Sequence, residues 1–132
     1  MINVTSKNGI KISYYLVDTI KNSAPAIIII NENFEINHWI KITTDDFAER
    51  GYVAITPDLA HNMKSRLATQ PITKAHLIKK LGAEEYTDYE AAIVDLALII
   101  TEVKALSNCN GKVAVVGFSS GATLAYLSAA RL

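Results

Sequence analysis

The sequence has one cysteine, Cys109, and no excess of charge of either sign. A single cysteine excludes a disulfide within the chain. Thirteen lysine and arginine residues balance thirteen aspartate and glutamate residues, so the formal net charge is zero. A surface for nucleic acid or for an anionic membrane would need a basic excess. We therefore expect neither nucleic acid nor a membrane as a partner.

Long hydrophobic runs are also missing from the sequence. The apolar run Ile27–Ile30 is far too short to span a bilayer, and no cationic segment followed by an apolar region opens the chain. We expect a soluble, cytoplasmic protein. Half of the 132 residues are hydrophobic and 20% are charged, which suffices for one domain with a core. The sequence thus predicts a single domain over residues 1–132.

The first half of the chain carries the patterns of three strands and a helix. Two segments that alternate apolar and polar residues, 2–5 and 10–14, flank Asn8-Gly9 and predict an antiparallel hairpin at the edge of a sheet. The continuous apolar run at 26–30 predicts a strand that is covered on both faces. A helix should follow from about residue 37 to residue 50, where Gly51 ends it.

The second half continues the alternation of strands and helices. Residues 52–56 predict another buried strand, closed by Pro57-Asp58. Residues 59–82 predict a loop with a short helix after Thr73. From about 84 to 107, apolar residues recur every three or four positions and predict a long helix with one broad apolar face. Asn110-Gly111 should then turn the chain into a strand at 113–116 and a last helix.

This order of elements predicts an α/β fold of three layers, with a mostly parallel sheet after an antiparallel start. Ligands of such sheets bind at the carboxyl ends of the strands. We therefore expect functional residues at the ends of three strands, at Asn31-Glu32, Pro57-Asp58 and Ser119. We expect Asp58 to order the turn after its strand rather than to react.

The segment Gly117-Phe118-Ser119-Ser120-Gly121 matches the G-x-S-x-G nucleophile elbow, in the strand–turn–helix setting that this motif requires. In such an elbow Ser119 would occupy a strained turn, and the two glycines would let strand and helix approach closely. The alternative is an ordinary tight turn between a strand and a helix, with a serine that has no catalytic role. A nucleotide-binding domain is a weaker idea, because neither glycine-rich phosphate-binding motif follows a strand.

Three blocks in order, residues 25–34, 47–59 and 111–118, resemble the dienelactone hydrolase family, which has the α/β-hydrolase fold. The resemblance covers most of the chain and is weakest across residues 60–83. It implies a hydrolase that acts on small-molecule esters or lactones, without a metal or another cofactor. It also implies that Ser119 is the nucleophile and Glu32 the catalytic glutamate, and that the backbone N–H groups of Ser120 and Asn33 form the oxyanion hole.

Two residues depart from the pattern of this family. The family elbow typically carries cysteine where this chain has Ser119. A thiol has a pKa of ~8.5, about four units above that of a glutamate, but a serine hydroxyl is a far weaker acid, so Glu32 alone is an inadequate base for Ser119. Ser119 needs a histidine. Ala122 stands where the family usually has a second glycine, and its methyl group would lie where helix meets strand.

The third departure is that no Asp, Glu or His follows Ser119, although the acid and the histidine of this fold come after the nucleophile. His38, His61 and His76 precede the elbow, and no motif marks any of them as the base. The sequence thus predicts a fold truncated after the elbow helix, with the apolar strand Val113–Phe118 as an exposed edge that invites another chain.

Two hypotheses remain open from the sequence. The first is a serine hydrolase whose acid and base come from elsewhere, for instance from a complementing C-terminal chain. The second is a catalytically inactive relic or interaction module that associates through its open sheet edge, as a homo-oligomer or with a partner.

Overall fold

The computed structural model describes residues 1–5, 9–19, 22–61 and 88–132, and these form five strands, three α-helices and a short 3₁₀ turn. The predictions for residues 62–87, which include the short helix after Thr73, His76 and the first turn expected for the long helix, lie outside the described residues. In chain order the elements are β1 (Ile2–Thr5), β2 (Lys11–Val17), β3 (Ala24–Ile30), η1 (Glu32–Phe34), α1 (His38–Glu49), β4 (Val53–Asp58), α4 (Tyr89–Lys104), β5 (Cys109–Gly117) and α5 (Ser120–Arg131).

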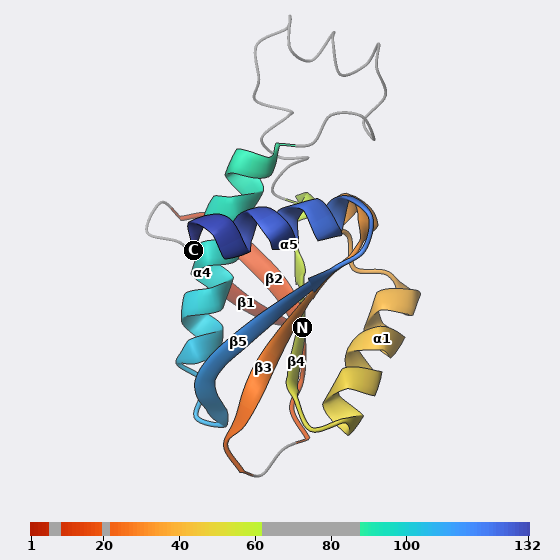
Figure 1. The fold of residues 1–132 in the computed structure, drawn as a ribbon, viewed down its shortest axis with the longest axis vertical. Coiled ribbons are helices and arrows are strands. Elements are labelled where there is room, and N and C mark those ends of the chain that lie inside the picture. The colour runs from red at the N-terminus through yellow and green to blue at the C-terminus, as the bar shows by residue number, and fades with distance from the viewer. Residues whose placement is uncertain (6–8, 20–21, 62–87) are drawn as a thin grey trace, which may run out of the picture.

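The five strands form one sheet in the order β1-β2-β4-β3-β5 (Figure 1). The predicted hairpin is confirmed, because β1 pairs antiparallel with β2, and β2 continues antiparallel onto β4. The strands β4, β3 and β5 run parallel to one another. β5 is the last strand of this order, so the predicted edge of the sheet is at β5.

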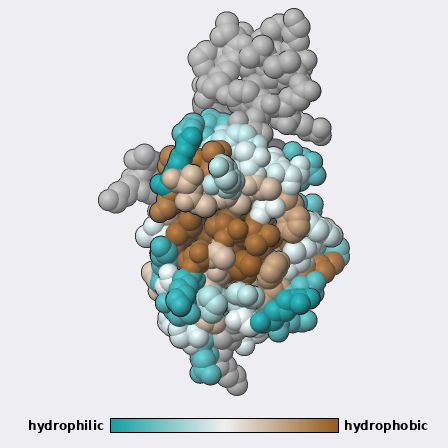
Figure 2. Space-filling view, viewed as in Figure 1, coloured by the Kyte–Doolittle hydropathy of each residue, from teal (hydrophilic) through white to brown (hydrophobic). Residues whose placement is uncertain are grey.

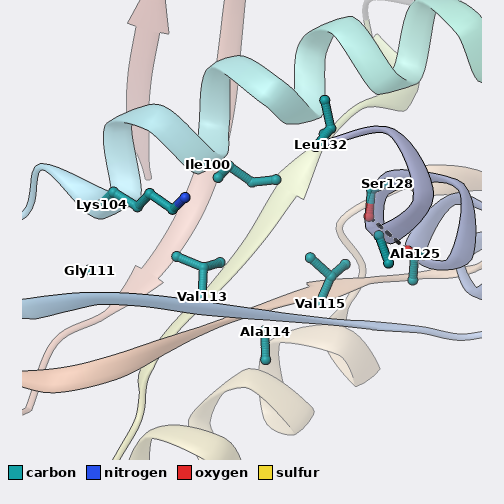
Figure 3. Close-up of a pocket in the computed structure, with 10 residues that line it drawn as sticks. Ile100, Lys104, Gly111, Val113, Ala114, Val115, Ala125, Ser128 and Leu132 are labelled. Atoms are coloured by element: carbon teal, nitrogen blue, oxygen red, sulfur yellow. Dashed lines mark hydrogen bonds between the residues drawn. The ribbon is translucent and has the colours of Figure 1, made fainter.

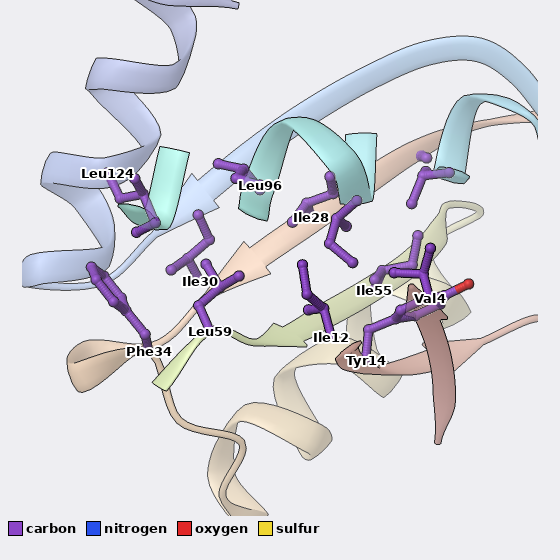
Figure 4. Close-up of a cluster of buried hydrophobic side chains, with 14 of the residues drawn as sticks. Val4, Ile12, Tyr14, Ile28, Ile30, Phe34, Ile55, Leu59, Leu96 and Leu124 are labelled. Atoms are coloured by element: carbon purple, nitrogen blue, oxygen red, sulfur yellow. The ribbon is translucent and has the colours of Figure 1, made fainter. Parts of the chain in front are cut away.

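The strand β3, which lies between β4 and β5, explains the three layers. Successive side chains of a strand point to opposite faces, and here Ile28 and Ile30 join a core with α4 and Leu124 of α5, part of which is drawn in Figure 4. On the other face, Ile27 and Ile29 pack with Ile40 of α1 and its neighbours. Because both faces of β3 are covered, every residue from 26 to 30 is at most 5% exposed. The continuous apolar run is therefore explained by burial on two sides.

The helices bury the faces that the apolar spacing predicts. In α4, the positions Ala92, Ile93, Leu96, Ile99 and Val103 are all buried. The helix begins after Asp88, whose Oδ1 accepts a hydrogen bond from the Ala91 N–H at 3.1 Å, and it ends at Lys104, before the predicted last position. In α1, Asn37 caps the first turn in the same way through the N–H of Ile40 at 2.9 Å. Among the described helices, none is long and apolar enough to cross a membrane.

Several boundaries differ from the sequence-based prediction, and those of β5 and β4 have a clear cause. β5 begins at Cys109 and includes the Asn110-Gly111 pair that predicts a turn, because the pairing skips these residues: Ala24 lies opposite Cys109, and Ala26 lies opposite Val113. The extra residues bulge out opposite Pro25, which has no N–H to donate to a ladder. Gly111 takes a φ of 85° there.

The strand β4 is also longer than predicted, because Pro57 and Asp58 belong to it. They lie opposite Tyr14 and Ser13 of β2. The neighbouring strand therefore extends β4 by two residues beyond the point where its own sequence suggests a turn.

The two isoleucines of α1 offer a matched test of this packing. Ile40 is fully buried between α1 and the sheet, whereas Ile42 is 46% exposed on the same helix. We expect Ile40→Ala to lower the free energy of unfolding by about 2–5 kcal/mol, the range for emptying such a site. Ile42→Ala makes the same chemical change at an exposed position and should stay within about 0.5 kcal/mol of the wild type. Urea denaturation measures both, and equal losses would contradict the described packing of α1.

Candidate active site

Ser119 lies at the sharp turn between β5 and α5, with an unusual backbone conformation. Its φ is 53° and its ψ is −120°, in a region that residues other than glycine seldom occupy. Holding a serine there costs on the order of 1–3 kcal/mol, which the surrounding structure must supply. Ser119 is exposed, and its side chain makes no capping hydrogen bond to the helix that follows. Ser119 therefore lies at the surface, directly after the carboxyl end of β5.

The two glycines of the motif are required by close backbone contacts. A Cβ atom at Gly117 would lie 1.9 Å from the carbonyl oxygen of Gly121, and a Cβ atom at Gly121 would lie 2.3 Å from that of Ile30. Both contacts are with backbone, which cannot move aside easily. The next position differs, because Ala122 is exposed and its methyl group does not lie between the helix and β3. The departure at Ala122 is therefore compatible with the elbow.

The elbow is fixed on both sides of Ser119 by backbone hydrogen bonds. The Phe118 N–H donates to the Ile30 carbonyl at 2.9 Å, and the Ala122 N–H donates to the Ser119 carbonyl at 2.9 Å. Ser120 is the first residue of α5, so its N–H has no acceptor within the helix. It adds to the positive end of the helix dipole beside Ser119, where negative charge is stabilised.

The loop after β3 is ordered by Asn31 and holds a second backbone N–H beside the elbow. The Asn31 side chain is buried, accepts from the Glu32 N–H at 2.9 Å and donates to the Glu35 carbonyl at 3.0 Å. Asn33 follows with a positive φ of 57°, and its N–H donates to the Ser120 hydroxyl oxygen at 3.1 Å. Residues separated by 87 positions in the chain thus meet at this point.

An aromatic pair flanks the elbow. Trp39, in the first turn of α1, packs edge-on against Phe118 with the ring centroids 4.9 Å apart. Despite this contact, 51% of Trp39 is exposed. On the other side of the loop, the buried Phe34 packs against Tyr89 of α4, with the centroids 6.0 Å apart.

Of the four candidate site residues, the structure brings Ser119, Ser120 and Asn33 together at the carboxyl ends of β3 and β5. Glu32 belongs to the same short turn η1 but is exposed. No hydrogen bond joins its carboxylate to Ser119 in the described part of the chain. The structural role of Asn31 was not apparent from the sequence, although an asparagine directly after a buried strand is a common turn signal.

The remaining polar candidates do not join this cluster. Asp58 orders the turn after β4, as expected, by accepting a hydrogen bond from the His61 N–H at 3.1 Å. His38 and His61 are exposed, and neither side chain has a hydrogen bond to Ser119 among the residues that the structure describes. Within the same residues, no group of three or more His, Cys, Asp or Glu side chains could hold a metal ion.

A mostly parallel sheet with helices on both faces, and a serine of positive φ between two glycines that lie against backbone, are typical of an α/β-hydrolase-type fold. A search of known proteins agrees and is more specific. The model of the dienelactone hydrolase family matches residues 12–132, and the chain therefore belongs to this family.

Curated relatives carry names from the same family. The chain is 31% identical to carboxymethylenebutenolidase 1 of Cupriavidus pinatubonensis and 29% identical to carboxymethylenebutenolidase of Pseudomonas putida, over 98% of its own length in both cases. It covers only 56% and 55% of those proteins. The chain thus spans about half the length of the curated relatives that it matches.

A solved structure is similar in fold. The structure of DcsB in complex with its substrate analogue matches 99% of this chain with a TM-score of 0.67 and 19% sequence identity. The match covers 41% of the DcsB chain. At this level of identity the similarity bears on the fold alone.

The contact between Gly121 and β3 can be tested by substitution. We expect Gly121→Ala to destabilise the protein by about 3 kcal/mol or more, above the usual 1–3 kcal/mol for an overpacked site, because the added Cβ meets the backbone of Ile30. Ala122→Ser, at the exposed neighbouring position, should change the free energy of unfolding by no more than about 0.5 kcal/mol. Chemical denaturation of both variants provides the comparison, and a tolerated Gly121→Ala would contradict the close approach.

Proposed function

We propose that this chain supplies the nucleophile and the oxyanion-binding groups of an ester or lactone hydrolase, with Ser119 as the attacking residue. The observation that carries the proposal is the backbone of Ser119, which has a φ of 53° at a turn where the residue is exposed. Strain of this kind is typical of functional sites. Membership of the dienelactone hydrolase family and the names of the carboxymethylenebutenolidases support the substrate class.

In the proposed reaction, the Ser119 Oγ attacks the carbonyl carbon of the ester or lactone. The carbonyl oxygen becomes negative and is stabilised by the N–H groups of Ser120 and Asn33. The bond between the carbonyl carbon and the alcohol oxygen then breaks, and water hydrolyses the acyl group from Ser119. In the structure, the Ser120 hydroxyl oxygen accepts the Asn33 N–H at 3.1 Å. In this proposal the Ser120 hydroxyl oxygen stands where the oxyanion would bind, and rotation of the Ser120 side chain about χ1 would free the Asn33 N–H for substrate.

The base that activates Ser119 is proposed to lie outside the described residues. A serine hydroxyl is too weak an acid for a carboxylate to deprotonate effectively, so a histidine is needed. The family relatives are about twice as long as this chain, which leaves ample sequence for an aspartate and a histidine. Glu32 keeps its proposed role as a carboxylate beside the oxyanion loop. The proposal also keeps the cytoplasmic location expected from the sequence.

A second candidate function is that of an inactive interaction module. It is favoured by the free edge of β5, which no described residue pairs on the side away from β3. The two candidates differ in one respect that can be measured, the reactivity of Ser119.

A fluorophosphonate probe with added imidazole tests this reactivity. The probe phosphonylates a nucleophilic serine with loss of fluoride, and imidazole can replace a missing histidine as the base. We expect the rate of Ser119 labelling to rise with imidazole concentration. A serine hydrolase site that lacks a triad residue still accelerates its reaction about 10³–10⁴-fold over water through oxyanion binding, so the site should remain reactive. Mass spectrometry should find no label at this site in Ser119→Ala. Ser107→Ala, an exposed serine before β5, should label like the wild type. Absence of Ser119 labelling at every imidazole concentration would favour the interaction module.

A cysteine at the elbow removes the need for a histidine and gives a second test. A thiol ionises near pH 8.5, and a helix N-terminus lowers its pKa. We expect Ser119→Cys, made together with Cys109→Ala, to react with iodoacetamide along a single titration curve whose midpoint lies below about 8.5. The wild type, whose half-buried Cys109 lies at the opposite end of β5, serves as the control and should react more slowly at pH 7. A midpoint above that of a free thiol would contradict an anion-stabilising site.

A further inference from the structure

The hydroxyl of Ser120 bonds a distant loop instead of its own helix. Its oxygen accepts the Asn33 N–H at 3.1 Å, and this is the one hydrogen bond that it makes among the residues that the structure describes. A serine within a helix commonly bonds a carbonyl about one turn earlier. Ser128 of the same helix does so, because its hydroxyl donates to the Ala125 carbonyl at 2.8 Å (Figure 3). Ser120 is the first residue of α5, and the chain one turn before it is the strand β5, so its hydroxyl has no helical carbonyl to bond.

The contact between Asn33 and Ser120 lies outside the apolar part of the surface. In the space-filling view, apolar side chains gather in the middle of the face over which β5 runs in Figure 1, and α5 begins at the margin of this area (Figure 2). Asn33 is exposed and Ser120 is half-buried. A hydrogen bond that water can reach contributes little net free energy, because both partners can bond water instead. This bond can therefore be exchanged for a bond to another ligand.

The loop side of the contact is held in place by Phe34. This residue follows Asn33 and also has a positive φ, 61°, which is an outlier for a bulky side chain. Its ring is 1% exposed and lies in the core with Leu59 and Leu124 (Figure 4). Its N–H donates to the Asn31 carbonyl at 3.2 Å, and its carbonyl accepts from the Leu59 N–H at 3.2 Å. Because both the ring and the backbone are held, the loop cannot move away from the elbow without disturbing the core.

The helix side of the contact can change by a single rotation. The backbone around Ser120 is fixed, because the Phe118 N–H donates to the Ile30 carbonyl and Gly121 lies directly against β3. The side chain of Ser120, in contrast, has one torsion with three staggered positions, and only the bond from the Asn33 N–H holds it in the observed one. Rotation of this side chain is therefore the smallest movement that frees the Asn33 N–H.

The charge on the reacting oxygen decides which acceptor the Asn33 N–H prefers. A neutral ester carbonyl and a hydroxyl are both uncharged acceptors, so a substrate that has not yet reacted gains little by displacing the Ser120 hydroxyl. A hydrogen bond to a negatively charged oxygen is roughly twice as strong as one between neutral groups. The exchange therefore becomes favourable as the oxyanion forms, which is the stage at which stabilisation accelerates a reaction.

We propose that the Ser120 hydroxyl closes the oxyanion hole of the empty site and restrains the reactivity of Ser119 until it rotates away. This role belongs to the side chain and is separate from that of the Ser120 backbone N–H. The inference rests on the proposed function, because it requires Ser119 to be the nucleophile. The competing role is that of a third donor, in which the Ser120 O–H would bond the oxyanion and assist the reaction. The two roles predict opposite effects of removing the hydroxyl.

The rate of Ser119 labelling tests the sign of this effect. The fluorophosphonate probe is used at one fixed imidazole concentration, and circular dichroism verifies that each variant folds. We expect Ser120→Ala to label about two- to tenfold faster than the wild type, the effect of one hydrogen bond that no longer has to be broken. Ser120→Thr keeps the hydroxyl and should label no faster than the wild type. Thr123→Ala removes an exposed hydroxyl three residues later in α5 and should leave the rate unchanged.

Amide hydrogen exchange at Asn33 tests the contact without any reaction. The Asn33 N–H is bonded to the Ser120 hydroxyl, so we expect its exchange to be about two- to tenfold faster in Ser120→Ala than in the wild type. Ser119→Ala cannot be labelled at this position but keeps the contact, and its Asn33 amide should exchange like that of the wild type.

The outcomes separate this inference from the proposed function. If Ser119 is labelled in the wild type and Ser120→Ala labels at an equal or lower rate, closure by Ser120 is overturned and the hydrolase function stands. Unchanged exchange at Asn33 in Ser120→Ala overturns the closure as well. If Ser119 is labelled in no variant, Ser120→Ala included, the hydrolase function is wrong and the inference fails with it.

Discussion

The close approach of the elbow to β3 is the constraint on which the rest of the site depends. The Phe118 N–H donates to the carbonyl of Ile30, and Gly121 lies so near the same carbonyl that no Cβ atom fits between them. With strand and helix held this tightly, the residue between them must reverse the chain within one position. Ser119 therefore adopts a positive φ, and the strain is balanced by the packing of α5 on the sheet.

The same approach brings two distant loops into contact. Because α5 begins directly against the end of β3, the loop that follows β3 faces the first residue of the helix. The contact between the Asn33 N–H and the Ser120 hydroxyl is its result, and Asn31 stabilises it by bonding within its own loop. The Asn33 N–H therefore lies beside the first residue of α5, as the proposed oxyanion hole requires.

Much of the fold follows from residue patterns that are local. The hairpin, the two-sided burial of β3 and the apolar face of α4 were all predictable, because each depends on the period at which apolar side chains recur. The boundaries of β4 and β5 were not. Pro57 belongs to a strand because β2 lies beside it, and Asn110-Gly111 forms a bulge because β3 holds both ends of the segment. Pairing with a distant strand replaced the turn that each local sequence favours.

For the site, the sequence by itself determined the residue types: a serine between two glycines, and an Asn-Glu-Asn segment after a buried strand. It could not determine the left-handed conformation of Asn33 or the contact between Asn33 and Ser120. Each of these joins segments that are far apart in the chain, and their separation is set by the register of the sheet and by the face on which each helix packs. The motif determines which residue stands at the turn, and only the packed sheet decides what lies beside it.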